Sequence, residues 1–454
     1  MTDTAQSPMY PLACIVLAAG QGTRMRSELP KVLHPIAGLP MLRHVTNACA
    51  ALAPERVVVV VAPGMKAVQE LVVPHRCAIQ QEACGTGDAV KAGRSELKGF
   101  VGDVMVLFGD TPLVTSEALL ALRQKRAATG AAIVVAGFTP VDPAAYGRLI
   151  LDNDGRLEAI VETNDATPEQ RLIRLCNGGI MLFDGATLGP LLDAIKDDNA
   201  KKEFYLTDCI GLARAQGLNC AVAEVSAENV LGVNTRVELA EAERLMQQRL
   251  RRQAMLGGAT LTDPDTVYLA ADTKIGRDVV IGPNVVIGAG VEIADNVEIR
   301  AFCHLEQVRV EAGAIVGPFA RLRPGSVVGA GAHIGNFVEI KNAEVGKGAK
   351  INHLSYIGDA FVGPKANIGA GTITCNYDGF LKSRTHVGAG AFIGSHTSLI
   401  APVTVGDGAY VGAGSVISMD VPADTLAVAR SRQSNIDGWA RRYREQKTRG
   451  AGDK

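Results

Sequence analysis

A six-residue period of aliphatic side chains in the second half of the chain limits its fold more than any other feature. Val, Ile or Leu recurs every six residues, with single-residue slips and one non-repeating insert, over segments 275–305, 310–340, 345–357, 362–368 and 387–417. Glycine follows many of these aliphatic residues, as in Ile281-Gly282 and Val411-Gly412. The pattern predicts a parallel β-helix, because each short strand contributes one branched side chain to a stack and then turns.

Composition agrees with a repeat and excludes several classes of protein. The 454 residues include 50 glycines and only 4% aromatics, which favours closely spaced backbone turns over a bulky aromatic core. Lys plus Arg number 46 and Asp plus Glu 47, so we expect no non-specific binding to nucleic acid, which requires a basic excess. No apolar run approaches the about 18 residues of a membrane helix, so we expect no membrane insertion. The N-terminus has no basic segment before an apolar one, so we expect no secretory signal.

Nine cysteines are scattered from Cys14 to Cys375 without a CxxC pair. Their odd number and spacing argue against a disulfide framework and against structural zinc. We therefore expect reduced thiols and a cytoplasmic protein.

The first half of the chain alternates short β-branched runs with amphipathic segments. The runs predict buried strands at 13–17, 56–61, 77–80, 104–108 and 132–137. The segments between them include expected helices at 41–52, 86–93 and 116–128. This alternation predicts a parallel, doubly wound α/β sheet, with ligands at the carboxyl ends of its strands.

Near Thr235 the pattern changes to one long amphipathic helix. Leu239, Ala242, Met246 and Leu250 share a face between residues 238 and 256, and Gly257-Gly258 ends the segment. We interpret it as a linker between domains. The expected domains are an α/β domain over 1–235, a linker helix over 236–257 and a β-helix domain with a C-terminal tail over 258–454.

A glycine-rich turn follows the first expected strand. It reads Leu17-Ala18-Ala19-Gly20-Gln-Gly22-Thr-Arg24-Met25, with Pro30-Lys31 shortly after. Such a turn offers backbone N–H groups to phosphate oxygens. The dinucleotide motif GxGxxG fails at Met25, and no GKS or GKT follows for a P-loop. The cations Arg24 and Lys31, beside these backbone N–H groups, suit the binding of a triphosphate that loses pyrophosphate.

The segment LAAGQGTRM with its downstream PK resembles the signature of the sugar-nucleotide pyrophosphorylases. Joined to a hexapeptide β-helix, it makes nearly the whole chain similar to the bifunctional N-acetylglucosamine-1-phosphate uridylyltransferase/glucosamine-1-phosphate N-acetyltransferase family. The resemblance implies a nucleotidyltransferase α/β domain followed by a left-handed parallel β-helix that carries the acetyltransferase.

The resemblance also implies the roles of residues in the first half. Arg24 and Lys31 would neutralise charge while the sugar phosphate attacks the α-phosphorus of UTP without a covalent enzyme intermediate. Asp110 and the amide oxygen of Asn234 would hold Mg²⁺, which prefers oxygen ligands; the alternative for Asp110 alone is an ordinary turn carboxylate. The expected nucleotide and sugar contacts are Leu17, Ala18, Ala19, Gly20, Lys31, Gln80, Gly85, Thr86, Phe108, Gly109, Asp110, Gly147, Glu162, Asn177 and Asn234. Phe108 departs from the Tyr that the family commonly has there.

Among the histidines of the repeat, His353 breaks the pattern. His304, His333 and His386 each precede a repeat aliphatic, so we interpret them as ordinary surface residues. His353 instead lies two residues after Ile351 among polar groups, and histidine is a suitable base for acetyl transfer to an amine. His353 also matches the family's catalytic base.

The resemblance implies further substrate contacts around His353. Arg323, Lys341, Tyr356 and Asn367 match sugar-phosphate contacts, as expected for cations that bind a phosphate monoester. The insert from Gly369 to Gly379 would belong to the active site. Expected contacts to substrate or acetyl-CoA there and later in the coil are Ala370, Asn376, Tyr377, Ser395, Ala413 and Arg430.

These residues lead to one expected function with two steps. Acetyl-CoA would acetylate glucosamine-1-phosphate, and UTP would then convert N-acetylglucosamine-1-phosphate to UDP-N-acetylglucosamine, a bacterial cell-wall precursor. The resemblance implies a homotrimer with acetyltransferase sites shared between chains. One alternative is a single-activity pyrophosphorylase whose β-helix is a trimerisation or regulatory module. Another is a non-enzymatic assembly protein.

The last sixteen residues, from Trp439, contain six basic residues and two acidic ones. They could form an anion-binding or interaction tail, but a solvated, frayed terminus is the preferred interpretation.

Overall fold

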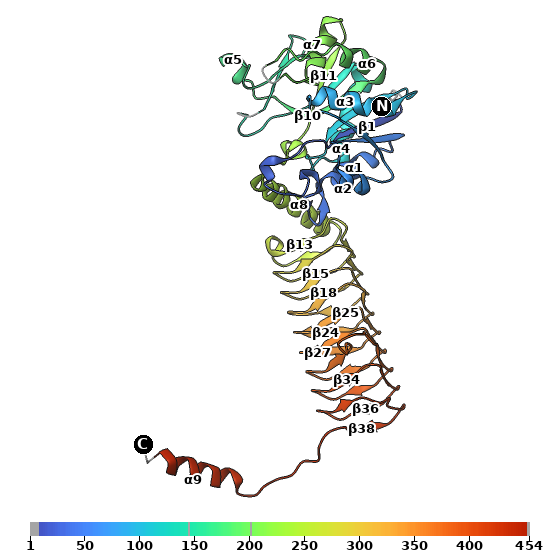
Figure 1. Ribbon diagram of the computed structural model, residues 1–454, viewed down its shortest axis with the longest axis vertical. Coiled ribbons are helices and arrows are strands. Elements are labelled where there is room, and N and C mark those ends of the chain that lie inside the picture. The colour runs from blue at the N-terminus through green and yellow to red at the C-terminus, as the bar shows by residue number, and fades with distance from the viewer. Residues whose placement is uncertain (1–8, 144–145, 200–201, 452–454) are drawn as a thin grey trace, which may run out of the picture. The chain divides into compact units, whose positions relative to one another are not determined.

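The computed structural model describes residues 9–143, 146–199 and 202–451 (Figure 1). The chain divides into two compact units, Met1–Arg252 and Gln253–Lys454. The division falls inside helix α8 (Arg236–Leu256), whereas we placed domain boundaries at the two ends of that helix. Residues 1–8, in which we expect no signal sequence, lie outside the described part. Among the described residues, no helix is both long enough and apolar enough to cross a membrane.

The first unit is built on a nine-stranded sheet. Its main path runs β11-β7-β10-β6-β1-β4-β5, and β8 and β9 extend it from β10. The strands are β1 (Leu12–Leu17), β4 (Arg56–Val61), β5 (Arg76–Ile79), β6 (Asp103–Phe108), β7 (Ile133–Phe138), β8 (Arg148–Leu151), β9 (Leu157–Val161), β10 (Cys176–Asp184) and β11 (Cys220–Glu224). A separate two-stranded pair joins β2 (Pro35–Ile36) and β3 (Leu39–Pro40).

Helices cover both faces of this sheet. One face packs against α1 (Met41–Ala50), α2 (Lys66–Leu71) and α4 (Ser116–Thr129), and the other against α3 (Thr86–Arg94), α6 (Gly185–Ala194) and α7 (Asp208–Ala215). Alternate residues of β1 enter the two cores, Cys14 and Val16 on one side, Ile15 and Leu17 on the other. The doubly wound α/β fold is therefore confirmed, and each predicted strand and helix is present with ends shifted by at most two residues.

The sheet is not wholly parallel, so that part of the prediction is wrong. Strand β10 runs antiparallel to both β6 and β7. A parallel return requires a long crossover, usually a helix, whereas β7 and β10 are separated by the hairpin of β8 and β9 and the short α5 (Pro168–Arg171). The apolar run of β10 gives no sign of strand direction, so the sequence pattern could not reveal this reversal.

The second unit is a parallel β-helix of three sheets. The first sheet contains β12 (Thr260–Leu261), β15 (Val280–Ile281), β18 (Glu298–Ile299), β21 (Ile315–Val316), β24 (His333–Asn336), β27 (Lys350–His353), β30 (Asn367–Ile368), β33 (Phe392–Ile393), β36 (Tyr410–Val411) and β38 (Leu426–Ala427). The second contains β13 (Tyr268–Leu269), β16 (Val286–Ile287), β19 (His304–Leu305), β22 (Arg321–Leu322), β25 (Glu339–Lys341), β28 (Tyr356–Gly358), β31 (Ile373–Cys375), β34 (Ser398–Ile400) and β37 (Val416–Ile417). The third contains β14 (Lys274–Ile275), β17 (Glu292–Ile293), β20 (Val308–Val310), β23 (Ser326–Val328), β26 (Glu344–Val345), β29 (Ala360–Val362), β32 (Thr385–Val387) and β35 (Val403–Val405).

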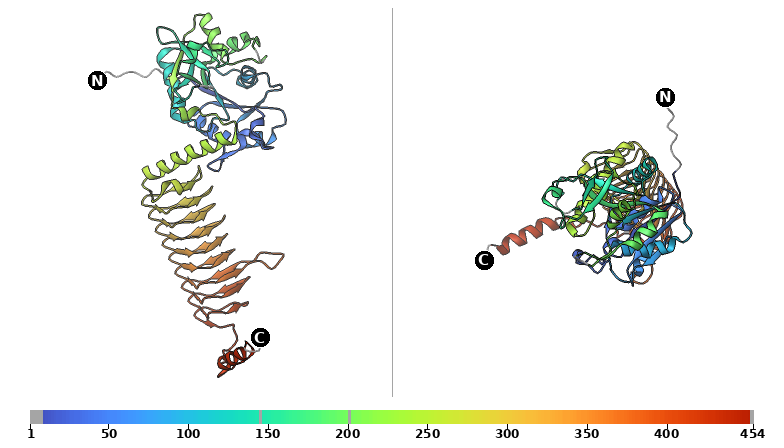
Figure 2. Two further views of the ribbon diagram at one scale, coloured as in Figure 1. Left: turned by 90° about the vertical axis from the view of Figure 1, so that its left-hand side faces the viewer. Right: turned by 90° about the horizontal axis from the view of Figure 1, so that it is seen from above.

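The six-residue period sets the size of each coil. Three hexads make one turn, so Ile281 pairs with Ile299, and a single-residue slip shortens the coil so that Ile293 pairs with Val310. The repeat aliphatic residues are buried in the stack, except Ile275 in the first coil, which is half-buried. The predicted start of the insert at Gly369 is too early, because β31 still pairs within the stack of coils. The residues between β31 and β32 leave the stack as a protruding loop (Figure 2), which we call the insert from here on.

Helix α8 contacts the first unit along the part that belongs to it. The Glu243 carboxylate accepts a hydrogen bond from the Ala37 backbone N–H at 2.7 Å, and Arg249 donates to the Leu113 carbonyl at 3.0 Å. Ala242 and Met246 are buried, as their predicted shared face requires. This part of the helix is therefore packed on the α/β domain.

The C-terminal tail forms helix α9 (Trp439–Ala451), so the expectation of a frayed terminus is wrong for these residues. The side chains described in it, from Trp439 to Thr448, are exposed, as expected of a solvated tail. Lys454, the last of the basic residues, lies outside the described part.

Candidate active sites

The carboxyl ends of β1, β5 and β6 surround a pocket of about 270 Å³. It contains ten of the predicted nucleotide-site residues: Leu17, Ala18, Ala19, Gly20, Lys31, Gln80, Gly85, Thr86, Phe108 and Asp110. Val32, Ala83, Ala89 and Glu203 complete the lining. Sequence reasoning missed these four, since nothing in their local pattern distinguishes them from packing or surface residues.

Lys31 joins the two predicted metal ligands. Its ammonium group forms an ion pair with the Asp110 carboxylate and donates to the amide oxygen of Asn234 at 3.0 Å. The Val233 N–H donates to the backbone carbonyl of Asp110 at 2.9 Å, which holds the Asn234 segment against the end of β6. The oxygens of Asp110 and Asn234 therefore converge on one cationic group.

Two glycines shape the backbone around this pocket. Gly22 has φ +65°, and a Cβ there would stand 2.5 Å from Cβ of Lys31. Gly85 has φ +105°, and a Cβ there would stand 2.7 Å from the Phe204 carbonyl. Glycine is needed at both positions because these dihedral angles and contacts exclude a side chain.

Gln80 is buried directly after β5, with its amide fixed in orientation. Its Nε2 donates to the Asp88 carboxylate at 2.9 Å and to the Gly85 carbonyl at 3.1 Å. A carboxylate can only accept, so this pairing identifies the N–H₂ end of the amide. Asp88 was not among the predicted residues, although it lies in the first turn of α3.

Other predicted residues of the first unit lie outside this lining. Arg24 is exposed on the short 3₁₀ helix at Thr23–Met25. Gly109 packs behind the pocket, with its N–H bonded to the Leu17 carbonyl at 2.8 Å.

Gly147, Glu162 and Asn177 form a second group. The Glu162 carboxylate lies over Gly147, 3.4 Å from where a Cβ would stand. The Asn177 N–H donates to the Gly147 carbonyl at 2.8 Å, and its side-chain oxygen accepts from the Gly179 N–H at 2.9 Å. The structure thus brings these three predicted residues together.

In the β-helix, His353 is held by a residue that sequence reasoning missed. Its Nδ1 lies 2.6 Å from Oδ1 of Asn336, and the two residues pair between β24 and β27. Because the amide oxygen is an acceptor, this contact selects the ring form with a proton on Nδ1. Nε2 of the exposed His353 ring then carries the lone pair. The pairing could have been found by counting back one coil of 17 residues.

Charged residues cluster on the strands of the second sheet and just after their carboxyl ends. Arg323 donates to the Glu339 carboxylate at 2.8 Å, and Glu339 pairs across strands with Tyr356. Asp359, buried near Lys341, accepts hydrogen bonds from Asn376 and, at 2.6 Å, from Asn342.

Desolvation works to raise the pKa of Asp359. The hydrogen bonds from Asn342 and Asn376, together with the charges of Lys341 and Lys382, outweigh it and lower the pKa below its ordinary value. The carboxylate therefore stays ionised and fixes the side chains of Asn342 and Asn376. Lys382, which sequence reasoning also missed, lies in the protruding insert, where its backbone pairs antiparallel with that of Tyr377.

Backbone hydrogen bonds connect His353 with several later predicted residues at one corner of the β-helix. The His353 carbonyl accepts from Gly371, the Ala370 carbonyl from His396, and the Ser395 carbonyl from Gly414. Cδ of Arg430 lies 3.7 Å from the point where a Cβ on Gly414 would stand. We call this set the corner column; it consists of His353, Ala370, Ser395, Ala413 and Arg430.

Asn367 on β30 is half-buried on the outer surface, and Tyr377 is exposed in the insert. The three histidines interpreted as ordinary surface residues lie on strands with their side chains at least partly exposed. Of these, His386 stacks on Phe361 with ring centres 4.6 Å apart.

Comparison with known protein families identifies both halves. Residues 14–175 match the MobA-like NTP transferase domain, and residues 272–307 and 384–418 match the bacterial transferase hexapeptide repeat.

Curated relatives match almost the whole chain. "Bifunctional protein GlmU" of Paramagnetospirillum magneticum is 57% identical over 436 residues, covering 96% of this chain and 97% of the relative. The protein of the same name from Rhodospirillum rubrum is 57% identical over 437 residues, covering 96% and 98%. That of Ruegeria sp. is 54% identical over 434 residues, covering 95% and 96%.

These relatives do not fit a single-activity pyrophosphorylase or a non-enzymatic assembly protein. A nucleotidyltransferase domain and a hexapeptide acetyltransferase domain in one chain account for both steps of UDP-N-acetylglucosamine synthesis. The chain therefore belongs to the GlmU family and is a bifunctional enzyme with uridylyltransferase and acetyltransferase activities.

Proposed function

We propose that the pocket at the ends of β1, β5 and β6 binds UTP and transfers its uridylyl group to N-acetylglucosamine-1-phosphate. The single observation that carries this proposal is the meeting of Lys31, Asp110 and Asn234 beside that pocket. The sugar phosphate oxygen attacks the α-phosphorus in line, the bond to the β-phosphate oxygen breaks, and pyrophosphate leaves. Lys31 stabilises negative charge in the transition state, and Arg24, from its exposed position, attracts the outgoing pyrophosphate.

Gln80 is the proposed reader of the base. Because Asp88 accepts from its Nε2, Gln80 presents its amide oxygen to the ligand, and an acceptor is complementary to the N3–H of uracil. Backbone groups at Gly85 and Thr86 lie beside it in the same lining. This arrangement supports selection of a uracil nucleotide.

The residues present fit a divalent cation. Asp110 and Asn234 supply one carboxylate and one amide oxygen that converge on a single cationic group, the ammonium of Lys31. Among the described residues, no cluster of three or more His, Cys, Asp or Glu side chains could hold a metal. A site with few protein ligands suits Mg²⁺, which keeps several waters and binds phosphate oxygens. When bound, Mg²⁺ would neutralise phosphate charge, and Lys31 would be free to turn toward the phosphates.

The second group of residues is assigned to the sugar. Glu162 and Asn177 offer acceptor oxygens next to Gly147, where the absence of a side chain leaves room for a ring substituent. We propose that they bind the hydroxyl and acetamido groups of N-acetylglucosamine-1-phosphate.

For acetyl transfer, His353 is the proposed general base. Asn336 keeps the proton on Nδ1, so Nε2 can take a proton as the amine of glucosamine-1-phosphate attacks the thioester carbonyl. The carbon–sulfur bond then breaks, and the thiol of coenzyme A leaves.

The cationic cluster is assigned to the phosphate of this sugar. His353 lies three residues before β28, whereas Lys341 is the last residue of β25 and pairs with Gly358 at the end of β28, so the length of one strand, about 7 Å, lies between the start of β28 and the cations. A sugar-1-phosphate can therefore place its amine near the base and its phosphate near the cations. Tyr356, Asn367, Asn376 and Tyr377 are proposed to contact the sugar between them.

The corner column is assigned to acetyl-CoA. Ala370, Ser395 and Ala413 are small and lie on successive coils, so an extended pantetheine arm can follow them away from His353. Arg430 at the end of the column suits a phosphate of the coenzyme.

We further propose a homotrimer formed through the β-helices, with each acetyltransferase site shared between chains. Exposed apolar side chains in the insert, Phe380 and Leu381, support a partner chain there. All nine thiols are free, which supports the proposed cytoplasmic location. Sedimentation should give about three times 47.6 kDa; a monodisperse monomer would contradict the trimer.

One assay tests both halves. Glucosamine-1-phosphate, acetyl-CoA, UTP and Mg²⁺ are combined, thiol and pyrophosphate are followed separately, and each component is omitted in turn. Thiol release should not need UTP, and pyrophosphate release should depend on prior acetylation. His353→Ala should lose acetyl transfer by about 10²- to 10⁴-fold but retain uridylyl transfer from N-acetylglucosamine-1-phosphate. Unchanged thiol release in this variant would exclude His353 as the base.

A further inference from the structure

Besides the nucleotide pocket, the α/β domain contains a basic pocket of about 450 Å³ between α3, α6 and the segment that follows α3. Among the described residues that line it are three cationic side chains and no carboxylate: Lys91, Arg94 and Lys98. Its apolar lining consists of Leu97, Phe100, Val104 and Leu188. A pocket lined by both cationic and apolar side chains is complementary to an organic anion with an apolar body.

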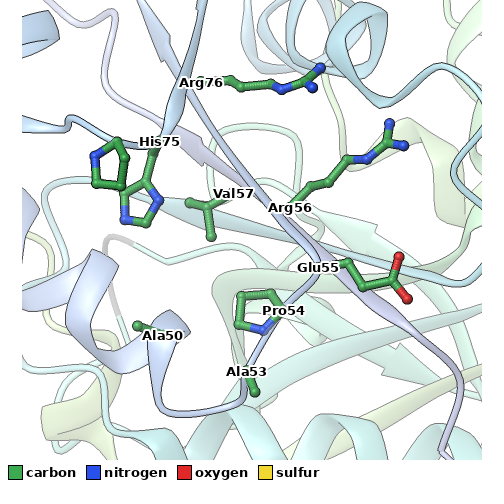
Figure 3. Close-up of a pocket in the computed structure, with 9 residues that line it drawn as sticks. Ala50, Ala53, Pro54, Glu55, Arg56, Val57, His75 and Arg76 are labelled. Atoms are coloured by element: carbon green, nitrogen blue, oxygen red, sulfur yellow. The ribbon is translucent and has the colours of Figure 1, made fainter.

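The wall of this pocket is held in place from behind. Two arginines at the amino ends of neighbouring strands donate to the segment after α3: Arg56 to the Lys98 carbonyl at 2.9 Å, and Arg76 to the Glu96 carbonyl at 3.3 Å. Figure 3 shows both arginines in an adjacent hollow, with their guanidinium ends extending to the same side, away from His75. That hollow contains Glu55 and its arginines already have partners, so it is the less suitable anion site.

The three cations of the basic pocket are less fully neutralised. Arg94 has an exposed ion pair with Asp193 at 3.9 Å, which is weak because water screens it. The Lys91 ammonium lies 5.1 Å from the ring centre of Phe204, a contact with an aromatic face. A dianionic group in the pocket would gain charge-assisted hydrogen bonds from these side chains.

Lys91 also connects this pocket with the proposed nucleotide site. The Phe204 N–H donates to the Cys84 carbonyl, and the Phe204 carbonyl accepts from Gly87, each at 2.8 Å. Gly85, between them, lines the nucleotide pocket, as does Glu203 beside Phe204. A ligand that draws Lys91 away from the Phe204 ring therefore acts on the segment that borders the nucleotide.

We propose that this basic pocket is an effector site for a phosphorylated organic anion, whose binding changes the affinity of the nucleotide site through Lys91 and Phe204. The binding part stands on the pocket alone, whereas the coupling rests on the function proposed above for the nucleotide pocket.

The test uses phenyl phosphate as the probe and calorimetric titration of the full chain. Phenyl phosphate should bind, and both inorganic phosphate and phenol should bind at least about tenfold more weakly, since each lacks one half of the complementarity. Lys91→Gln and Lys98→Gln should each weaken binding of phenyl phosphate by about tenfold. Lys66→Gln, an exposed lysine at the start of α2, is the matched control and should have no effect. Equal binding by all variants, or equal binding of inorganic phosphate, would overturn the proposal.

A second titration is made with the nucleotide pocket filled by UTP. Phenyl phosphate should still bind, with a changed affinity in the parent chain and an unchanged affinity in Phe204→Leu, which removes the ring that Lys91 contacts. Complete loss of binding with UTP would mean that the probe occupies the nucleotide pocket, and the effector site would be rejected. An unchanged affinity in the parent would overturn the coupling. Absence of uridylyl transfer would instead count against the function of the nucleotide pocket, because binding of phenyl phosphate alone does not depend on it.

Discussion

Nδ1 of His353 lies 2.6 Å from Oδ1 of Asn336, a residue 17 positions earlier that pairs with it in the adjacent coil. The backbone register of two parallel strands thus aligns the proposed base with the amide oxygen that its Nδ1 contacts. Gly335, next to Asn336, has no room for a side chain, because a Cβ there would stand 1.9 Å from the Asn352 carbonyl. The pair is therefore set by close backbone packing as well as by its own hydrogen bond.

Asn336→Ala should lower kcat for acetyl transfer by about 10- to 100-fold, because His353 loses the acceptor that keeps its proton on Nδ1. KM for glucosamine-1-phosphate should change little. Thiol release gives both constants, and uridylyl transfer in the same preparation controls for folding. A wild-type kcat would show that Asn336 does not position the base.

Removal of divalent metal by chelation should stop pyrophosphate release and leave thiol release unchanged.

Asp110→Asn should reduce uridylyl transfer at least about 10²-fold, because a charged ligand and the partner of Lys31 are lost together. Asn234→Ala should raise the Mg²⁺ concentration for half-maximal rate. Metal-independent pyrophosphate release would reject the assigned ligands.

Gly22→Ala should slow uridylyl transfer by displacing Lys31. The new Cβ would stand 2.5 Å from Cβ of Lys31, and the positive φ adds about 1–2 kcal/mol of strain. Gly64→Ala is the matched control, since Gly64 also has positive φ (+83°) but no atom within 4 Å of the new Cβ. A similar loss of activity in both variants would mean that strain alone is responsible.

Asp359→Asn should destabilise the β-helix in a pH-dependent way. The folded pKa of Asp359 lies below its ordinary value of 3.8, so its ionisation stabilises the fold above that pH, and this contribution is lost as pH falls further. The substitution should cost about 1–3 kcal/mol near neutral pH, because Asn342 and Asn376 lose a charged acceptor. Thermal unfolding from pH 3 to 7 measures the difference, which should shrink below pH 3.8. Glu344→Gln, at an exposed carboxylate, should show no such trend.

At most three of the nine thiols should react with a thiol reagent in the folded protein. Six are buried, and burial raises the pKa of Cys209 to about 12 and that of Cys303 to about 11, so their thiolate is scarce at neutral pH. Cys77, Cys84 and Cys375 are half-buried and should account for the reaction. Titration with and without denaturant counts both sets, and rapid reaction of more than three native thiols would be the contrary result.

Much of the fold was predictable because its periodicities are local. Three six-residue repeats separate Ile281 from Ile299, and this spacing is the length of one coil of the β-helix. Likewise, the β-branched runs locate most strands of the first unit. The antiparallel direction of β10 was not predictable, since strand direction depends on the connection and not on the side chains of the strand.

For the sites, motif residues such as Gly20 and Lys31 were found because their chemistry is concentrated in one segment. Glu203, Asp88 and Asn336 were missed because they reach the sites from positions distant in sequence or from an unremarkable local pattern. Only three-dimensional pairing reveals such partners. The family resemblance supplied the remaining assignments, and among those in the first unit the structure leaves Arg24 and Glu162 exposed and outside the pocket lining.

The corner column has one consequence that its individual contacts do not express. Each coil advances by the fixed spacing of neighbouring strands, about 4.8 Å, so the four steps from His353 to Arg430 span about 19 Å. With acetyl-CoA assigned to this column as proposed above, the distance from the reacting thioester to Arg430 is a whole number of coils. Adding or deleting one coil would then change the length of the acyl carrier that fits by one fixed step.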